Sequence, residues 1–122
     1  MQSAVGRRRS SGSGDMSDEI CPVAEAARVL GNKWTLIILR DLADGPRRFK
    51  DLERTGEGVS PSVLTARLRE LEHYGLLNRA SYNEIPPRVE YSLTDQGCDA
   101  LRIIDAMRTF GEKWLVPEPA PA

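Results

Sequence analysis

The stretch that decides the fold runs from Ser60 to Tyr91 and reads SPSVLTARLRELEHYGLLNRASYNEIPPRVEY. Ser60 is a favoured N-cap residue and Pro61 a favoured first helical residue, so we expect a helix to begin there. Gly75 suits the position just past a helix C-terminus, because glycine adopts the left-handed backbone conformation at little cost. The residues between them therefore predict a single capped helix.

The predicted helix has two different faces. At about 100° per residue, Leu64, Leu68 and Leu71 fall within roughly 60° of one another and predict an inward stripe. The opposite side carries Ser62, Thr65, Ala66, Arg69 and His73, and Arg67 lies at the flank of the stripe. A helix that packs on one side and presents short polar and basic side chains on the other suits the major groove of DNA. Such a face alone is more often merely solvated, so the neighbouring elements decide the interpretation.

A short β-ribbon follows the helix. Residues 76–82 predict one strand, 83–87 a loop and 88–93 the return strand. In the return strand Val89, Tyr91 and Leu93 alternate with Arg88, Glu90 and Ser92. A ribbon beside a groove-binding helix can contact the neighbouring groove or the DNA backbone. We therefore predict a mainly α fold with a small β-wing (α+β), the winged helix-turn-helix.

Arg88, at the tip of this ribbon, is a candidate contact for phosphate or for a narrow minor groove. The alternative is a surface ion pair with Glu84 or Glu90, and the sequence favours neither. Pro86 and Pro87 stiffen the tip and remove amide donors, which discourages association through a strand edge.

Helices also precede this region. Apolar residues at helical spacing predict a helix that begins at Pro22 and is stopped by Gly31. Residues 33–42 are apolar almost all round and predict a central, buried helix. The remaining predicted elements are a turn at 44–46, a very short strand at 47–49, a third helix ending near Thr55 and a turn at 56–58.

A long final helix, capped by Thr94, is predicted from Asp95 to about Leu115. Its apolar stripe consists of Leu101, Ile103, Ile104, Met107, Phe110, Trp114 and Leu115. A domain of this size hardly needs so much apolar surface there, so an exposed stripe indicates a partner. A two-fold homodimer is the simplest partner, and it would place two recognition helices roughly 34 Å apart, one turn of DNA.

Length and composition limit the other possibilities. A chain of 122 residues has room for one domain with a modest core, which we place at 16–115. Residues 1–15 predict a disordered basic extension, either dispensable, with Met16 as the true start, or an arm that contacts the DNA backbone. Residues 116–122 predict a flexible, proline-rich tail.

No apolar run approaches the roughly 18–20 residues needed to span a bilayer, and the N-terminus lacks an apolar secretion signal. Cys21 and Cys98 are too few for a disulfide scaffold. We therefore expect a cytoplasmic protein with no membrane partner, associated with the nucleoid when it is bound to an operator.

The charge pattern is compatible with sequence-specific DNA binding. The net charge is −1, but basic residues cluster locally on a near-neutral body, which favours specific binding over indiscriminate coating of phosphate. The candidate DNA contacts are Arg47, Arg48, Lys50, Ser60, Ser62, Thr65, Ala66, Arg67, Arg69 and Arg88.

Enzymatic function is not indicated. His73, the one histidine, has no accompanying pattern of metal ligands, and neither a phosphate-binding glycine loop nor a Ser/His/Asp arrangement is evident. We expect no catalysis, no metal and no cofactor. The rival function is a winged-helix module that docks a protein on the outward face of the helix after Ser60.

A third possibility is a regulator that senses a small apolar effector between its dimer helices and its DNA-binding core. Trp34, Ile38, Phe110 and Trp114 are candidates to line such a pocket, although we favour core packing for them. Ile103 and Met107 are further candidates for the dimer contact or the pocket.

Several motifs occur together between about residues 20 and 115. They are Cys21-Pro22, Gly31-Asn32-Lys33-Trp34, Gly45-Pro46-Arg47-Arg48-Phe49, Leu64-Thr65-Ala66-Arg67-Leu68-Arg69-Glu70-Leu71-Glu72 and Pro86-Pro87-Arg88-Val89-Glu90-Tyr91. In combination they resemble the HxlR family of bacterial transcription regulators. The resemblance implies a dimeric winged-helix repressor or activator of MarR-like shape, whose N-terminal and C-terminal helices form the dimer.

The resemblance also implies a role for Cys21, as a thiol sensor of quinones, aldehydes, hypochlorite or disulfide stress. A position just before a helix favours the thiolate, whereas Asp18 and Glu19 act against it. Alkylation by a small electrophile and a disulfide between two Cys21 thiols are both open, and Cys98 is the only other thiol. The alternative is that Cys21 is a small buried residue at the dimer interface.

Overall fold

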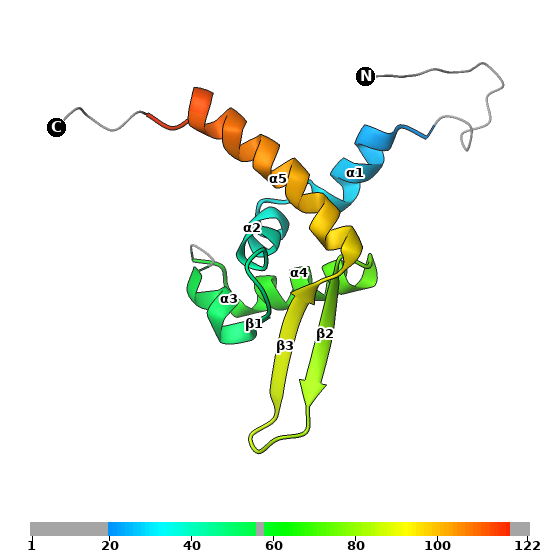
Figure 1. Ribbon diagram of the computed structural model, residues 1–122, viewed down its shortest axis with the longest axis vertical. Helices are drawn as coiled ribbons and strands as arrows, with labels where there is room; N and C mark the ends of the chain where they lie inside the picture. The colour runs from blue at the N-terminus through cyan, green and yellow to red at the C-terminus, as the bar shows by residue number, and fades with distance from the viewer. Residues whose placement is uncertain (1–19, 56–57, 118–122) are drawn as a thin grey trace. The chain divides into compact units, whose positions relative to one another are not determined.

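The computed structural model describes residues 20–55 and 58–117. The elements in these ranges are α1 (Pro22–Leu30), α2 (Lys33–Asp41), β1 (Arg47–Arg48), α3 (Phe49–Thr55), α4 (Pro61–His73), β2 (Leu77–Tyr82), β3 (Arg88–Leu93) and α5 (Asp95–Trp114) (Figure 1). The predicted extension at 1–15, two residues of the predicted turn at 56–58 and most of the predicted tail lie outside the described residues. Among the described residues, no helix is long and apolar enough to cross a membrane.

The chain divides into two compact units, residues 1–31 and 32–122. In the first, α1 begins at Pro22 and is capped by Cys21, whose Sγ accepts a hydrogen bond from the backbone N of Ala24 at 3.5 Å. The helix ends where the Gly31 N–H donates to the Ala27 carbonyl at 2.7 Å. A Cβ at Gly31 would collide with that carbonyl oxygen, so only glycine fits there. Both predicted ends of this helix are confirmed.

In the second unit, α2 begins at Asn32, whose Oδ1 accepts hydrogen bonds from the backbone N atoms of Trp34 (2.9 Å) and Thr35 (3.3 Å). One face of α2 is buried, against α4 and α5. The prediction of burial all round is wrong in part, because Trp34, Leu36 and Ile37 are only half-buried. A helix covered by neighbours on one side leaves its other apolar residues at the surface of the single chain.

The core of the described residues is built mainly from leucine. Its buried hydrophobic side chains are Ile38, Leu39, Leu42, Leu52, Val59, Leu64, Leu68, Leu71, Leu76, Leu77, Ala100 and Ile104. All three leucines of the stripe predicted on α4 are among them. Packing of this stripe on α2 sets which face of α4 is left for a partner.

The three strands form one antiparallel sheet in the order β1-β3-β2. Arg47 pairs with Tyr91 and Arg48 with Glu90, so β3 is the middle strand and the predicted three-residue strand at 47–49 is shortened to two. Figure 1 shows the β2–β3 hairpin extending beyond the helices as a wing. The predicted alternation of burial in β3 is not seen, because all six of its residues are half-buried. A ribbon that projects past the core has no covering layer to bury one face.

A glycine-containing joint connects α4 to the wing and to α5. Gly75 has a positive φ of 85° and follows the α4 cap. The Gly75 N–H donates to the Glu72 carbonyl at 3.1 Å, and the Leu76 N–H donates to the Leu71 carbonyl at 2.9 Å. These bonds form a Schellman-type helix end. The Thr94 hydroxyl donates to the Gly75 carbonyl at 2.6 Å and accepts from the Gly97 N–H at 3.1 Å. The start of α5 is therefore tied to the end of the helix that is expected to bind DNA.

Candidate nucleic-acid interface

The outward face of α4 is polar and sterically open. Ser62, Ala66 and Arg69 are exposed, as is His73 in the last turn, whereas Thr65 is half-buried. Ser60 caps the helix by accepting from the Val63 N–H at 3.2 Å, and its hydroxyl lies 3.4 Å from that of Ser62. Short side chains in the first turn let the backbone approach base edges closely. The predicted division of α4 into an apolar inner and a polar outer face is confirmed.

Arg67 is less available than Arg69. Its guanidinium forms an ion pair with Glu70, with 3.0 Å between Nη1 and Oε1, and only 26% of its side chain is exposed. Its Nε is buried without a hydrogen-bond partner. A partly covered and already compensated arginine must give up its carboxylate before it can bind a phosphate.

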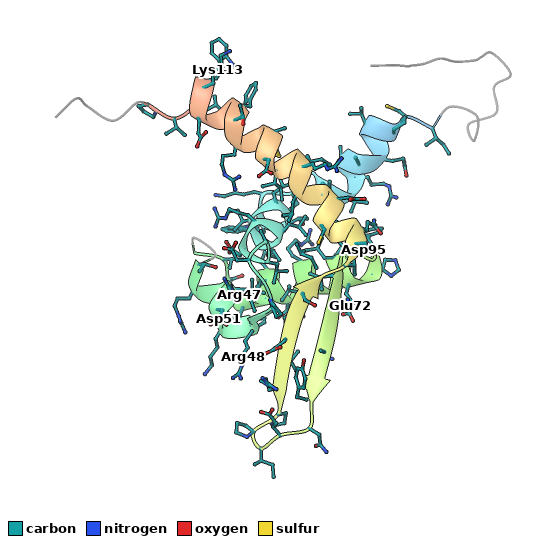
Figure 2. All side chains as sticks on the ribbon, in the orientation of Figure 1. Arg47, Arg48, Asp51, Glu72, Asp95 and Lys113 are labelled. Carbon is teal, nitrogen blue, oxygen red and sulfur yellow. The ribbon has the colours of Figure 1, made fainter. Side chains whose placement is uncertain are left out.

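A basic cluster lies at the start of α3. Arg48 and Lys50 are exposed and Arg47 is half-buried. The Arg48 backbone N donates to Asp51 Oδ2 at 3.1 Å, which satisfies an amide at the α3 N-terminus. Figure 2 shows Arg47, Arg48 and Asp51 together at this point of the second unit. The pairing of Arg47 with Tyr91 and of Arg48 with Glu90 places the cluster beside the wing.

Arg88 is held between two carboxylates. Its Nη2 lies 2.8 Å from Glu84 Oε2, and its Nη1 lies 3.3 Å from Glu90 Oε2. Its guanidinium also stacks over the Tyr82 ring at 4.1 Å. The predicted alternative of an ion pair is therefore what the structure shows, with both glutamates rather than one. A contact between Arg88 and DNA stays a prediction.

Sequence reasoning missed two residues on these surfaces. Val63 is exposed in the first turn of α4, and Arg79 is exposed on β2 with no ion pair within the described part of the chain. Val63 lies about 100° from Leu64 on a helical wheel, outside the leucine stripe, and this angle was a usable signal. Arg79 gave no signal beyond being a base in a predicted strand.

An apolar stripe is exposed along α5. Phe110 and Trp114 are 59% and 66% exposed, and Ile103 and Met107 are also exposed. The core packing that we favoured for Phe110 and Trp114 is therefore wrong within a single chain, although Ile38 is buried as expected. The first turns of α5 pack on the core, but the helix has twenty residues in all and its later turns extend past the core.

Both cysteines are exposed and free, Cys21 at the α1 cap and Cys98 in the first turns of α5. The predicted alternative of a buried Cys21 is therefore not seen among the described residues. Across 20–55 and 58–117 no group of histidine, cysteine, aspartate and glutamate side chains could hold a metal ion.

Residues 29–119 match the family described as HxlR-like helix-turn-helix. The chain belongs to this family. The HxlR-family chain is similar to an HTH-type transcriptional regulator of Synechocystis sp., with 46% identity over 99 residues, which cover 81% of this chain and 73% of the relative. It is therefore a transcriptional regulator of the helix-turn-helix type, as the motifs predicted.

Solved structures support the same fold for the HxlR-family chain. A MarR-family transcriptional regulator from Porphyromonas gingivalis W83 superposes with a TM-score of 0.76 and 36% identity, over 88% of this chain and all of that one. The redox regulator HypR in its oxidised form superposes with a TM-score of 0.73 and 36% identity, over 82% of this chain and 100% of that one. The predicted MarR-like winged helix-turn-helix is confirmed.

Proposed function

We propose that this chain binds a palindromic DNA operator as a homodimer and thereby regulates transcription. The observation that carries the proposal is the division of α4, whose leucines are buried while Ser62, Ala66 and Arg69 face outward. A recognition helix enters the major groove with its N-terminal residues toward the base edges. Arg69 is exposed on this face, and in the proposal it donates to guanine or to phosphate. Thr65 contacts the groove from the edge of this face.

Phosphate contacts would hold the recognition helix in register. Arg48 and Lys50 are exposed, and together with Arg47 they lie where β1 meets the wing. On the wing, Arg79 offers an uncompensated charge, whereas Arg88 must first release Glu84 and Glu90. Contacts of this kind position the protein without reading sequence.

The α5 stripe supplies the surface for a second copy. Ile103, Met107, Phe110 and Trp114 fall within about 60° on a helical wheel, so they form one continuous strip. A two-fold axis through this strip pairs it with itself. The two recognition helices are then expected in successive major grooves.

The signal in this proposal is a change at Cys21. Its thiol is exposed, and the similar HypR is a redox regulator with an oxidised form. An electrophile forms an S–C bond to Cys21 with loss of the thiol proton. Alternatively, diamide takes two electrons and two protons from two Cys21 thiols and leaves one disulfide. Either change alters the spacing of the two recognition helices and so the stability of the DNA complex.

The first experiment measures binding to DNA upstream of the protein's own gene and its divergent neighbour, by mobility shift. Arg69→Ala should weaken specific binding by about 1–3 kcal/mol per half-site, since one base contact is lost. Arg102→Ala is the matched control, an exposed arginine on the solvent side of α5. Equal affinity of the Arg69 and Arg102 variants would contradict the role of Arg69. An absence of binding at low salt would favour the protein-docking function.

A second arm adds diamide or a quinone to the bound complex. Release from DNA that is lost in Cys21→Ser and kept in Cys98→Ser is the expected result. Release that persists in Cys21→Ser would exclude the thiol switch at that residue. Binding indifferent to both oxidant and Cys21 would leave a regulator whose signal is a ligand.

A further inference from the structure

We propose that Val63 is a specificity-determining residue of α4 that contacts the 5-methyl group of a thymine in the operator. This inference rests on the proposed DNA-binding function and adds to it a base identity and a chemical class of contact. No other large hydrophobic side chain in α4 is counted as exposed.

Val63 lies where the helix is expected to meet the bases. It is in the first turn of α4, and the Ser60 hydroxyl accepts its backbone N–H at 3.2 Å, so its place in the helix is well defined. Its exposed fraction is 37%, whereas the leucines of the stripe are 0–2% exposed. The short side chains of Ser62 and Ala66 flank it on the outward side and leave its methyl groups free to touch a surface.

Helix stability does not explain this valine. Valine is a poorer helix former than alanine, leucine or arginine, because its branched Cβ loses rotamer freedom against the preceding turn. Val63 is 37% exposed, so one part of its side chain packs on its neighbours and the other part is open to contact with a partner. The same branching fixes χ1 in a helix, so its two methyl groups are presented in one direction and little entropy is lost on contact.

The neighbours of Val63 favour an apolar contact over a charged one. Arg67, one turn further along the same side, is paired with Glu70 at 3.0 Å, so the charges beside Val63 compensate each other. In the major groove, thymine is distinguished from the other bases by its methyl group, which apolar side chains contact. The two methyl groups of Val63, beside the paired charges of Arg67 and Glu70, therefore suit contact with the methyl group of thymine.

The test uses a duplex selected by the full chain from a random-sequence library. Each thymine of the selected duplex is then replaced in turn by deoxyuridine, which removes only the 5-methyl group. We expect one thymine in each half-site whose replacement weakens binding about fourfold, the effect of one buried methyl group. Val63→Ala should bind the thymine duplex about as weakly as the original chain binds the uracil duplex. The variant should bind the uracil duplex with the same affinity as the thymine duplex, because the contact that the methyl group makes is already lost.

Two controls keep the result specific. Val63→Thr preserves the shape and one of the two methyl groups, so it should retain part of the sensitivity to uracil. Val63→Ala improves helix propensity but removes two partly covered methyl groups, so a single cooperative thermal melt, rather than an unchanged melting temperature, shows that the fold is intact.

Several outcomes would overturn the inference. They are selected sites without a fixed thymine, binding indifferent to uracil at every position, and a loss on uracil substitution that is the same with and without Val63. These outcomes leave DNA binding itself established. A chain that selects no duplex overturns the DNA-binding proposal, and this inference with it.

Discussion

At the scale of single residues, Thr35 is an exception within an apolar core. It is 1% exposed, and its Oγ1 has no hydrogen-bond partner. Its backbone N is satisfied by the Asn32 cap, so only the hydroxyl is unpaired. Thr94 shows the opposite case, because its hydroxyl both donates to Gly75 and accepts from Gly97. The Thr35 hydroxyl is therefore expected to destabilise the folded chain, whereas the Thr94 hydroxyl is expected to stabilise it.

Thr35→Val is expected to raise the free energy of unfolding by about 1 kcal/mol. The substitution keeps a β-branched shape and removes a buried hydroxyl that pays a desolvation cost without a bond. Urea denaturation at one fixed protein concentration measures the change, because an oligomer's stability depends on concentration.

The matched control is Thr94→Val, which removes a hydroxyl with two partners and the α5 cap. It should lower the free energy of unfolding by about 1–2 kcal/mol. If Thr35→Val destabilised the chain as much as Thr94→Val, the Thr35 hydroxyl would have a partner in solution.

At the scale of elements, the wing carries two arginines in different electrostatic settings. Arg88 is compensated by Glu84 and Glu90 and covered by the Tyr82 ring. Arg79, on β2, is exposed and forms no ion pair in the described ranges. The wing therefore presents one free positive charge and one that stiffens its tip.

Arg79→Gln is expected to reduce the salt dependence of operator binding, while Arg88→Gln leaves it nearly unchanged. Each phosphate neutralised contributes about 0.9 to the slope of log affinity against log salt concentration. Fluorescence anisotropy at several salt concentrations gives this slope for both variants. A reduction of about 1.8 in Arg88→Gln, about 0.9 for each of the two copies, would instead show that Arg88 exchanges its carboxylates for phosphate.

At the scale of the whole molecule, the described residues leave an apolar stripe of α5 exposed. Ile103, Met107, Phe110 and Trp114 lie along one side of a twenty-residue helix. Monomeric proteins seldom expose a continuous apolar strip of this kind. The same strip in a second copy would cover it. A two-fold dimer formed in this way would bind two symmetric half-sites, so we attribute the proposed palindromic symmetry of the operator to α5.

Phe110→Asp should convert the proposed dimer to monomers and abolish tight binding to a palindrome, because it places a charge in the centre of the strip. Sedimentation equilibrium measures the first effect and a mobility shift the second. Thr109→Asp adds the same charge one residue away, at an exposed position outside the strip, and should leave both unchanged. A Phe110 variant that stays dimeric would place the interface elsewhere.

The amino-acid sequence by itself determined the local features of this protein. Ser60 and Pro61 start α4, Gly75 ends it and Thr94 starts α5, all as predicted. These features follow from bonds between residues three to five apart, so their signals lie within one short window. The leucine stripe was predictable for the same reason, because helical spacing alone places it on one face.

Only the tertiary structure decided which residues are covered and which are paired. β3 became the middle strand because Arg47 and Arg48, some forty residues earlier, pair with it. Phe110 is exposed because α5 outruns the core. Each outcome depends on elements distant in the chain, whose arrangement no local pattern specifies.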